Sequence, residues 1–559
     1  MPLVPRRIGL LFACFFVLLA LAGMRTGWLA TVQGGTLKRA ANTQQVAVVP
    51  LPAKRGTIVD RRGTELAVSE PADDVSANPH LVTDPAAYAK LLAPLLGRSE
   101  PDVLEDLVRR HTGFVYLARA LPAEQGDRIQ KLTIKGERLA GIDLTPTTRR
   151  TYPRDWLASQ VLGHVGTDGK GLTGLEYAFD RSLHGVDGKR RLVRDGGGKA
   201  ISVKDPAPAQ PGHEVELTLD AAIQAKAEVA LGKIGAKYKP KGATAVVMNP
   251  STGELLAVAN WPRIDANAPL SAAPETAQRN LAAGYTYEPG STFKAVTVAG
   301  ALEDGAVTPE TSFDLPPKIQ VADREIGESH DRGPVTLTTA QILAQSSNVG
   351  AIKIGLAEGK TGFSKWVDRF GFGKPTGVDL PGEEKGIVVP LAKYSGSSMG
   401  NMPIGQGIAV TPLQIARAYA AIANGGRLVR PHVVKEVGGD SVAPTTAKRI
   451  ISENTALQLR TMLEGVFAPG GTASEVEIPG YKLAGKTGTA NKVDPKTGEY
   501  SKAHYIASFV GFAPALKPKL LVSVMVDDPQ GAIYGGEVAA PAFGDIMGFA
   551  LSHLEIPPG

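Results

Sequence analysis

Apolar residues follow three different patterns along the chain. Residues 8–24 form an unbroken apolar run, at the short end of what spans a bilayer and longer than most signal-peptide cores. Residues 31–212 combine short strand-like segments with leucines at helical spacing around 91–107. From residue 213 on, strand-like segments and longer helical periods both recur. These patterns predict one membrane helix followed by two folded regions.

The region 213–559 is predicted to be an α+β domain. Alternating or continuous apolar segments predict strands near 214–219, 243–248, 255–259, 482–486, 506–512 and 520–526. Helical composition or periodicity predicts helices near 221–234, 291–302, 338–356, 412–424, 454–466 and 539–554. Strands, a helical middle and further strands indicate helices packed on a largely antiparallel sheet.

A stretch rich in glycine and proline separates this region from the one before it. Gly196-Gly197-Gly198 is followed by Pro206, Pro208 and Pro211-Gly212, residue types that interrupt helices and strands. We therefore predict a cytoplasmic tip and membrane anchor at 1–30, a first domain at 31–212 and a second domain at 213–559.

Charges beside the apolar run bear on its orientation. Arg6 and Arg7 precede the run and, with the free amine, are expected on the cytoplasmic side. A cleaved signal peptide is the alternative, because Ala20-Leu21-Ala22 has the small-x-small form of a cleavage site. We favour an uncleaved anchor, which predicts a single-pass protein of the cell membrane with the rest of the chain extracytoplasmic.

Composition excludes several kinds of chemistry. The 61 basic and 55 acidic residues leave a net charge of only +6, and no basic block with interleaved aromatic residues predicts nucleic-acid binding. The single cysteine, Cys14, lies within the apolar run, so neither an intrachain disulfide nor a thiolate metal site is expected. The nine histidines show no metal-ligand spacing. We expect no metal and no cofactor.

Ser291-Thr292-Phe293-Lys294 is the most informative stretch of the chain. A serine and a lysine three positions apart on a helix face the same way, so an amine lies beside a hydroxyl that it could activate. The turn formed by Tyr287-Glu288-Pro289-Gly290 would place Ser291 at a helix N-terminus, where developing negative charge is favoured. Taken alone, the motif is better described as a capping serine followed by a solvated lysine.

Two further motifs strengthen the catalytic interpretation. Ser346-Ser347-Asn348 follows a helical segment, and Lys486-Thr487-Gly488-Thr489 lies at the end of a predicted strand. The patterns Ser-x-x-Lys, Ser-x-Asn and Lys-Thr-Gly in this order are typical of penicillin-recognising serine acyltransferases.

Other copies of the short motifs are explained by local structure. Ser76-Ala77-Asn78 precedes the nucleophile, and Ser452 is predicted to cap the helix near 454–466. Lys360-Thr361-Gly362 is predicted to terminate a helix, and Lys496-Thr497-Gly498 to lie in a turn.

A phosphate loop is the competing interpretation of the third motif. Residues 480–487 match Gly-x-x-x-x-Gly-Lys-Thr, which must open directly into a helix to bind phosphate. Gly488, Asn491, Pro495 and Gly498 follow instead, so we do not expect a nucleotide site here.

With these motifs, nearly the whole chain resembles class B penicillin-binding proteins, most closely the cell-division branch. The resemblance also rests on Arg55-Gly56-Thr57-Ile58-Val59-Asp60-Arg61-Arg62-Gly63, Arg150-Thr151-Tyr152-Pro153 and Gly405-Gln406-Gly407. It implies a transmembrane helix, a β-rich elongated, non-catalytic pedestal domain of the dimerisation type at 31–212, and a transpeptidase domain at 213–559. The latter would have an antiparallel sheet covered by helices, as in serine β-lactamases.

The resemblance also implies roles for individual residues. Ser291 would attack the bond between the last two D-alanines of a stem peptide, and Lys294 would be its base, with a pKa lowered by burial or by a cationic neighbour such as Lys486. Ser346 would relay the proton to the departing D-alanine. The implied catalytic residues are Ser291, Lys294, Ser346, Asn348 and Lys486, and the implied substrate-binding residues are Thr487, Gly488 and Thr489.

The implied activity is D,D-transpeptidation of peptidoglycan, with inhibition by β-lactams. Stem peptides of glycan made from a lipid-linked precursor would be the substrates, and a membrane glycosyltransferase and other division proteins the partners. A D-Ala-D-Ala carboxypeptidase or β-lactam-binding hydrolase is one alternative, since water could replace the acceptor amine. A non-catalytic division scaffold is the other.

Overall fold

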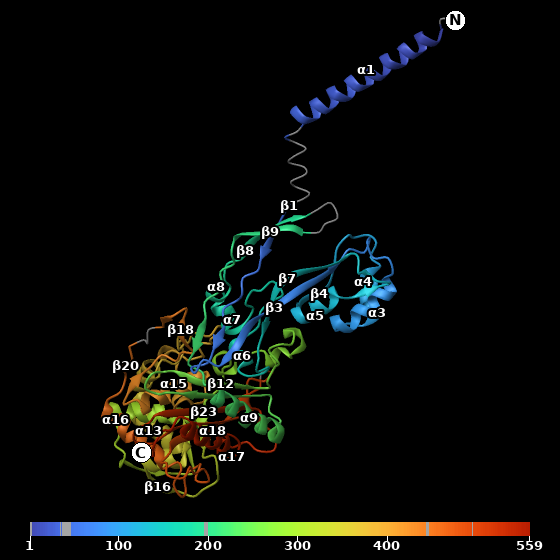
Figure 1. Cartoon of the computed structure of the whole chain (residues 1–559). Helices are drawn as coiled ribbons and strands as arrows, with labels where there is room; N and C mark the ends of the chain where they lie inside the picture. The colour runs from blue at the N-terminus through green and yellow to red at the C-terminus, as the bar shows by residue number, and fades with distance from the viewer. Residues whose placement is uncertain are drawn as a thin grey trace. The chain divides into compact units, whose positions relative to one another are not determined.

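The computed structural model describes residues 3–33, 35, 46–194, 200–442, 446–494 and 496–558, which form two compact units (Figure 1). Unit 1 comprises Met1–Lys54, Pro71–Thr148 and Gly185–Pro211, and unit 2 comprises Arg55–Glu70, Arg149–His184 and Gly212–Gly559. Two segments that precede residue 212 are thus part of the same unit as the C-terminal region. The division at 30 and 212 stays a prediction, and Gly196–Gly198 of the expected linker lies outside the described residues.

Unit 1 begins with one long helix, drawn in dark blue in Figure 1. α1 (Leu3–Thr31) includes a segment of 25 residues from Arg7 to Thr31, within which an 18-residue stretch has a mean hydropathy of 2.3. Within the described ranges it is the one helix long and apolar enough to cross a membrane. The helix is longer than the apolar run at 8–24, which places it comfortably within the length that a bilayer requires.

The rest of unit 1 is a small mixed core. Its helices start and end at residues suited to those positions: the Asp84 carboxylate caps α3 (Pro85–Leu96) by accepting from Ala87 N–H, and Gly97 ends the helix in a left-handed conformation. One sheet has the order β1 (Val46–Leu51), β8 (Gly188–Arg194), β9 (Ala200–Ala207). The other elements are the C-terminal half of β3 (Glu65–Ala77), α4 (Glu100–Leu107), β4 (Val115–Pro122), α5 (Ala123–Gln130), β5 (Thr133–Ile134), β6 (Glu137–Arg138) and β7 (Ile142–Thr151).

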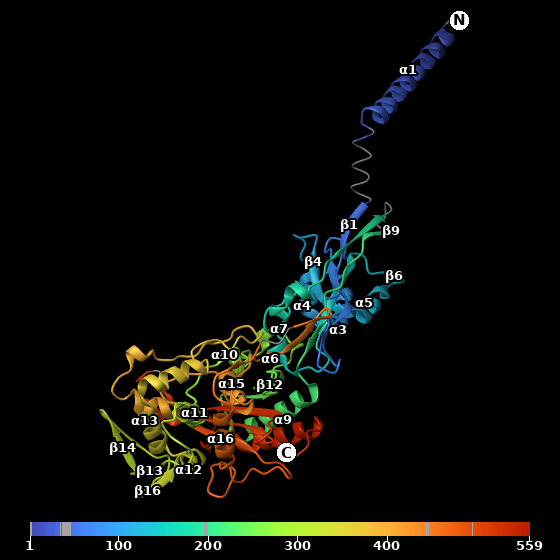
Figure 2. The same cartoon turned by 90° about the vertical axis from the view of Figure 1, so that its left-hand side faces the viewer.

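A five-stranded antiparallel sheet is the centre of unit 2 (Figure 2). Its order is β12 (Leu255–Trp261), β11 (Gly242–Met248), β23 (Leu520–Asp527), β22 (Tyr500–Ala513), β21 (Ala484–Val493). Alternation along β11 sends Ala245 and Val247 to one apolar cluster and Val246 to another. Both faces of the sheet are therefore buried, and β21 is left at one edge.

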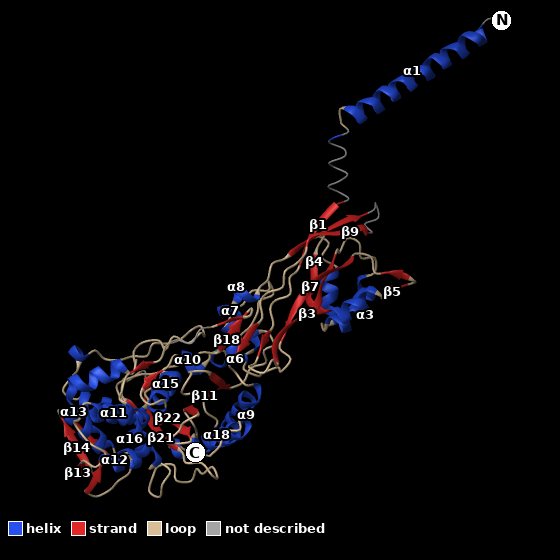
Figure 3. Cartoon of the chain, turned by 60° about the vertical axis from the view of Figure 1, so that its left-hand side comes forward, coloured by secondary structure: helices blue, strands red, loops and turns tan. Residues whose placement is uncertain are grey.

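Helices cover both faces of this sheet (Figure 3). α9 (Ala221–Tyr238) and α18 (Ala540–His553) share one apolar cluster with it, while α11 (Lys294–Glu303), α15 (Pro412–Ala423) and α16 (Glu453–Glu464) share the other. The expected antiparallel sheet covered by helices is confirmed. Ser452 caps α16 as predicted, accepting a hydrogen bond from Thr455 N–H at 3.1 Å.

One prediction about the helical middle is wrong. The helix expected at 338–356 is two helices, α12 (Thr339–Gln345) and α13 (Asn348–Arg369), because Ser346 adopts a left-handed conformation with φ +62°. The helix end predicted at Lys360-Thr361-Gly362 is confirmed to within a residue. The first part of α13 ends at Gly359, where φ is +81° and ψ is 156°, and a second helical part follows as far as Arg369.

The remaining elements of unit 2 are short. They are β2 (Ile58–Val59), α6 (Ser159–Leu162), α7 (Gly174–Ala178), α8 (Asp180–Leu183), β10 (Val215–Leu217), α10 (Leu281–Gly284), the 3-10 turn η3 (Gly290–Phe293), β13 (Ser312–Leu315), β14 (Lys318–Val321), β15 (Arg324–Gly327), β16 (Val335–Thr338), α14 (Ser398–Asn401), β17 (Arg427–Leu428), β18 (Val434–Val437), β19 (Asp440–Ser441), β20 (Lys448–Arg449) and α17 (Gly535–Val538).

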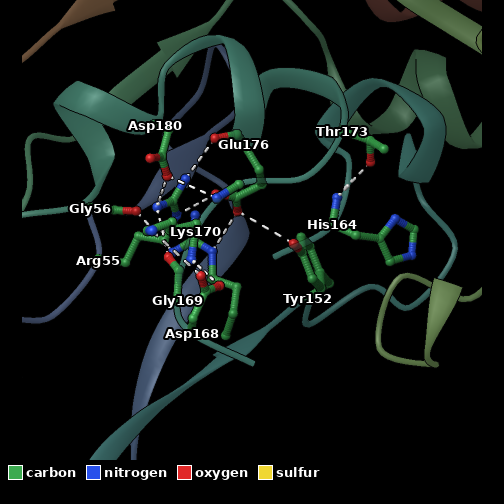
Figure 4. A network of polar contacts seen from close by, with 12 residues as sticks. Arg55, Gly56, Tyr152, His164, Asp168, Gly169, Lys170, Thr173, Glu176 and Asp180 are labelled. Carbon is green, nitrogen blue, oxygen red and sulfur yellow. Dashed lines mark hydrogen bonds and ion pairs between the residues drawn. The ribbon is translucent and has the colours of Figure 1, made fainter. Parts of the chain in front are cut away.

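A buried ion-pair network joins two separate segments of unit 2 (Figure 4). Glu176 in α7 is fully buried and accepts hydrogen bonds from Arg55 Nε at 2.5 Å and Arg150 Nε at 2.6 Å. Arg55 also donates to Asp180 at 2.6 Å, and Tyr152 OH donates to Glu176 at 3.4 Å. Because an unpaired buried charge is costly, these groups hold segments 55–70 and 149–184 together.

Candidate active site

Ser291 lies in a tight turn immediately before a helix. It belongs to η3, and Lys294 is the first residue of α11. Gly290 has φ +53°, and a Cβ there would lie 2.7 Å from the Thr489 carbonyl oxygen, so only glycine fits. Tyr419 OH donates to the Thr292 carbonyl at 2.7 Å and fixes the turn. Ser291 is partly exposed and lines a cavity of about 820 Å³.

The Lys294 amine joins the first motif to the second. Its Nζ donates to the Ser346 carbonyl at 2.6 Å, to Asn348 Oδ1 at 2.7 Å and to Ser346 Oγ at 3.3 Å. The left-handed backbone at Ser346 lets both the Ser346 carbonyl and Asn348, the first residue of α13, contact Lys294 Nζ. Within the described part of the chain, the Ser291 hydroxyl has no hydrogen-bond partner, so it is free to meet a substrate carbonyl.

The third motif lies on β21, the edge strand. The strand continues through Lys486 to Val493 with no helix after it, which contradicts a phosphate loop. Lys486 is fully buried, and its Nζ lies 3.3 Å from both the carbonyl and the hydroxyl oxygen of Thr487. Thr487 Oγ1 is 2.7 Å from Thr472 Oγ1, and Thr489 Oγ1 accepts from Gly535 N–H at 3.2 Å. Thr472, Thr487, Thr489 and Gly535 all line the Ser291 cavity.

Gly488, an implied substrate-binding residue, is required for a reason that the sequence did not indicate. A Cβ at this position would lie 2.3 Å from Ser508 Oγ and 2.9 Å from Thr292 Cγ2, both within the protein. Glycine here therefore allows the turn that carries Ser291 to pack directly on β21.

The two buried lysines have lowered pKa values. Burial brings the pKa of Lys294 down to about 7, while the negative charge of Glu328 opposes this shift and the positive charge of Arg332 adds to it. Burial lowers the pKa of Lys486 far below its usual value, and repulsion from Lys294 lowers it further. Of the two causes expected for the lowered pKa of Lys294, burial is the larger, and the cationic contribution comes from Arg332. A base with a pKa near 7 is well matched to proton transfer at neutral pH.

Glu328, Arg332 and Ser347 belong to the site although sequence reasoning missed them. Glu328 follows β15, and its carboxylate accepts from Asn348 N–H at 2.7 Å and from Ser347 Oγ at 2.7 Å. Arg332 Nη2 pairs with Glu328 at 2.5 Å and donates to Ser347 Oγ at 3.0 Å. The spacing Glu-x-x-x-Arg could have indicated that Glu328 and Arg332 form an ion pair, but nothing in the sequence indicates that this pair contacts α13.

Over the described ranges, the structure contains no group of three or more His, Cys, Asp or Glu residues arranged to hold a metal ion. The arrangement supports acyl transfer through a serine: a nucleophile at the mouth of a cavity, a buried amine with a pKa near 7, and threonine hydroxyls on an edge strand.

Comparison with known proteins gives matches over both parts of the chain. Residues 243–548 match the family described as "Penicillin binding protein transpeptidase domain", and residues 50–217 match "Penicillin-binding Protein dimerisation domain". The chain is 34% identical over 559 residues to the peptidoglycan D,D-transpeptidase FtsI of Escherichia coli K12, covering 99% of this chain and 92% of that protein. It is 36% identical over 567 residues to stage V sporulation protein D of Bacillus subtilis, covering 99% and 86%.

Solved structures match as well. Penicillin-binding protein 3 of Mycobacterium tuberculosis, in a crystal structure with aztreonam, matches with a TM-score of 0.71 and 29% identity. The alignment covers 91% of this chain and 98% of that one.

Proposed function

Because the chain belongs to the class B penicillin-binding proteins, we propose that it is a peptidoglycan D,D-transpeptidase acting through an acyl-enzyme on Ser291. The observation that carries the assignment of residues is the buried Lys294 amine. It has a pKa near 7 and lies within 2.7 Å of Asn348 Oδ1, one helical turn from a serine at the cavity mouth.

The acylation step uses groups already described. Ser291 Oγ bonds to the carbonyl carbon of the penultimate D-alanine, and its proton passes to Lys294 Nζ. Negative charge on the carbonyl oxygen is stabilised by the backbone N–H groups of Ser291 and Thr489, and such a donor contributes roughly 3–4 kcal/mol. The peptide bond then breaks, and the departing D-alanine nitrogen receives a proton through Ser346.

The remaining groups bind the substrate and complete the reaction. Thr487 and Thr489 hydroxyls, with the charge of Lys486 behind them, hold the terminal carboxylate. An extended stem peptide pairs with the free edge of β21 as an added strand. An amine of a second stem peptide attacks the Ser291 ester, forms the cross-link and returns the proton to Ser291. A β-lactam acylates Ser291 in the same way, but its leaving group stays attached.

The cellular setting is part of the proposal. α1 anchors the chain in the cell membrane, with unit 2 on the extracytoplasmic side, where peptidoglycan lies. We place the enzyme in septal wall synthesis, with a membrane glycosyltransferase that supplies glycan and with other division proteins as partners.

Labelling with a fluorescent penicillin tests the proposal. Wild type should be labelled and Ser291→Ala should not, whereas Ser329→Ala, a serine that lines the same cavity, should label like wild type. A substrate with a D-Ala-D-Ala end and an acceptor amine should then give cross-linked product. Absence of label on wild type would refute the acyl-enzyme, and label with hydrolysis but no cross-link would identify a carboxypeptidase.

A further inference from the structure

A second cavity in unit 2 shares no lining residue with the Ser291 cavity. This basic pocket has a volume of about 520 Å³ and forms where the end of α15, the β17–β20 pair, α16 and the turn between β22 and β23 meet. Its charged lining consists of one carboxylate and five cationic side chains, namely Glu453, Arg427, Arg449, Arg460, Lys517 and Lys519.

The single carboxylate of the basic pocket, Glu453, does not balance the five positive charges that line it. Within the described part of the chain, none of the five cationic side chains forms an ion pair. Arg449 Nη1 donates to the Gly425 carbonyl at 2.5 Å and Arg460 Nη1 to the Ala423 carbonyl at 3.4 Å, which positions both guanidinium groups but leaves their charge.

Arg460 is the least satisfied of these groups. Its Nε is buried and has no hydrogen-bond partner among the described residues. Burial lowers the pKa of its guanidinium, and Glu453 only partly opposes this effect. A buried donor without a partner is costly, and the charge of this guanidinium is only partly compensated, which favours an anion in the pocket that Arg460 lines.

Two other cavities lined by described residues of unit 2 lack this excess of positive charge. The Ser291 cavity is lined by the carboxylates Glu328, Glu475 and Glu537 and by no lysine or arginine. A smaller cavity between α9 and α18 is lined by two lysines and two carboxylates. The basic pocket therefore does not simply reflect the mild net charge of the whole chain.

We propose that the basic pocket binds a phosphate-type anion that carries at least two negative charges. A ligand with a single carboxylate would neutralise only one of the five cations. A pyrophosphate or a group of clustered phosphodiesters accepts several charge-assisted hydrogen bonds at once. The planar guanidinium forks of Arg427, Arg449 and Arg460 match the spacing of phosphate oxygens. The volume lies within the range typical of small-molecule sites.

Calorimetric titration of the full chain in zwitterionic lipid nanodiscs with inorganic pyrophosphate tests this proposal. We expect saturable binding with one site per chain that weakens as salt is added. Arg427→Gln/Arg449→Gln should weaken binding by about tenfold or more, since each charge-assisted bond is worth about 1.5–3 kcal/mol. Lys517→Glu/Lys519→Glu changes two residues of the exposed turn and should abolish pyrophosphate binding. This variant leaves the hydrogen bonds of Arg449 and Arg460 in place.

Controls separate a site from general charge. Arg154→Gln/Arg279→Gln removes two exposed arginines outside the pocket and should bind pyrophosphate like wild type. Penicillin labelling of every variant reports folding independently of the pocket. Vesicles containing anionic phosphatidylglycerol form a second arm of the test. If the vesicles bind and the pocket variants weaken that binding in the same way, the phosphate belongs to a lipid. If only pyrophosphate binds, the phosphate belongs to a soluble or polymer-borne group.

Three results would overturn the proposal. They are the absence of saturable pyrophosphate binding, binding that the pocket variants do not alter, and tighter binding of poly-L-glutamate than of pyrophosphate at equal charge. The last result would identify the pocket as a site for an acidic peptide.

Discussion

Neutralising Glu328 probes how the second motif is held against Lys294. Glu328→Gln keeps the size and shape of the side chain but removes the charge that accepts hydrogen bonds from Ser347 Oγ and Asn348 N–H, both at 2.7 Å. It also leaves Arg332 without its partner at 2.5 Å. Two separate consequences follow, one for the position of Asn348 and one for the proton affinity of Lys294.

The first consequence is a slower reaction at every pH. A hydrogen bond to a charged group is worth about 1.5–3 kcal/mol, and one between neutral groups about 0.5–1.5 kcal/mol. Ser347 and Asn348 donate to different oxygens of Glu328, and Gln keeps only one acceptor oxygen, so one bond is weakened and the other is lost, at a cost of roughly 3–4 kcal/mol. If the transition state depends on that arrangement, acylation at high pH falls by about a hundredfold to nearly a thousandfold, since 1.4 kcal/mol corresponds to about tenfold.

The second consequence is a shift of the pH profile toward acid. Neutral Lys294 is the base, so acylation rises with pH through a midpoint near its pKa of about 7. The charge of Glu328 raises that pKa and the charge of Arg332 lowers it, so Glu328→Gln should lower the midpoint. A charge in direct contact shifts a pKa by about 1–3 units, and for Glu328, which acts across Asn348, we expect roughly half a unit to one unit.

Stopped-flow acylation by a fluorescent penicillin measures both quantities across the acid and neutral range. Glu325→Gln is the matched control, because this carboxylate lies in the same hairpin and pairs with Lys318 at 2.7 Å, but is exposed. The positioning role would be refuted if Glu328→Gln had the same acylation rate at high pH and the same midpoint of its pH profile as wild type. A midpoint shifted to higher pH would also refute it. A plateau loss of the same size in Glu325→Gln would show that the hairpin as a whole is responsible.

Three further predictions test other parts of the structure. Gly488→Ala should slow acylation by about tenfold or more because its Cβ forces the nucleophile turn away from β21, whereas Gly333→Ala, where a Cβ meets nothing within 4 Å, should not. From about pH 7 to pH 10, Lys294 is protonated in the unfolded chain but not in the folded chain, so the free energy of unfolding of the wild type should rise with pH. Lys294→Met should reduce that rise by roughly 1.4 kcal/mol per pH unit, as measured from unfolding midpoints. Glu176→Gln leaves buried Arg150 without a carboxylate and Arg55 with Asp180 alone, and should destabilise unit 2 by about 3–5 kcal/mol in the same assay, with exposed Glu275→Gln near neutral.

The outcomes that would contradict these predictions are equally specific. Normal acylation in Gly488→Ala would mean that the turn tolerates displacement. If the pH dependence of stability is unchanged in Lys294→Met, a group other than Lys294 takes up the proton on unfolding. If the unfolding midpoint of Glu176→Gln equals that of wild type, the buried ion-pair network is not needed for stability.

Local patterns were enough to predict most elements of unit 2. The continuous apolar run of β11 and the helical composition of α9 each carry their signal within a few residues, so the sheet covered by helices could be predicted. The break between α12 and α13 could not, because the left-handed conformation of Ser346 is imposed by tertiary contacts and has no propensity signal.

The site was predictable to the extent that its residues occur in ordered motifs. Ser291, Lys294, Asn348 and Lys486 were found from spacing, and their roles stay predictions until they are tested. Glu328 could not be found, because its relation to Asn348 depends on how the β14–β15 hairpin packs beside α13, a contact between segments that carry no shared pattern.

The pairing of β2 with β10 has a consequence for biosynthesis. Ile58 lies opposite Val215 in a parallel register, and near the other end of the chain His553 lies 3.0 Å from Asp220. Unit 2 thus combines segment 55–70 with residues made about 500 positions later. At about 5–20 residues per second, synthesis between those points takes roughly half a minute to two minutes. Partners of segment 55–70 lie between Arg150 and Ala221 and are made early in that time, but β21, β22, β23 and α18 are made last, so the sheet of unit 2 cannot be completed before synthesis has passed α18.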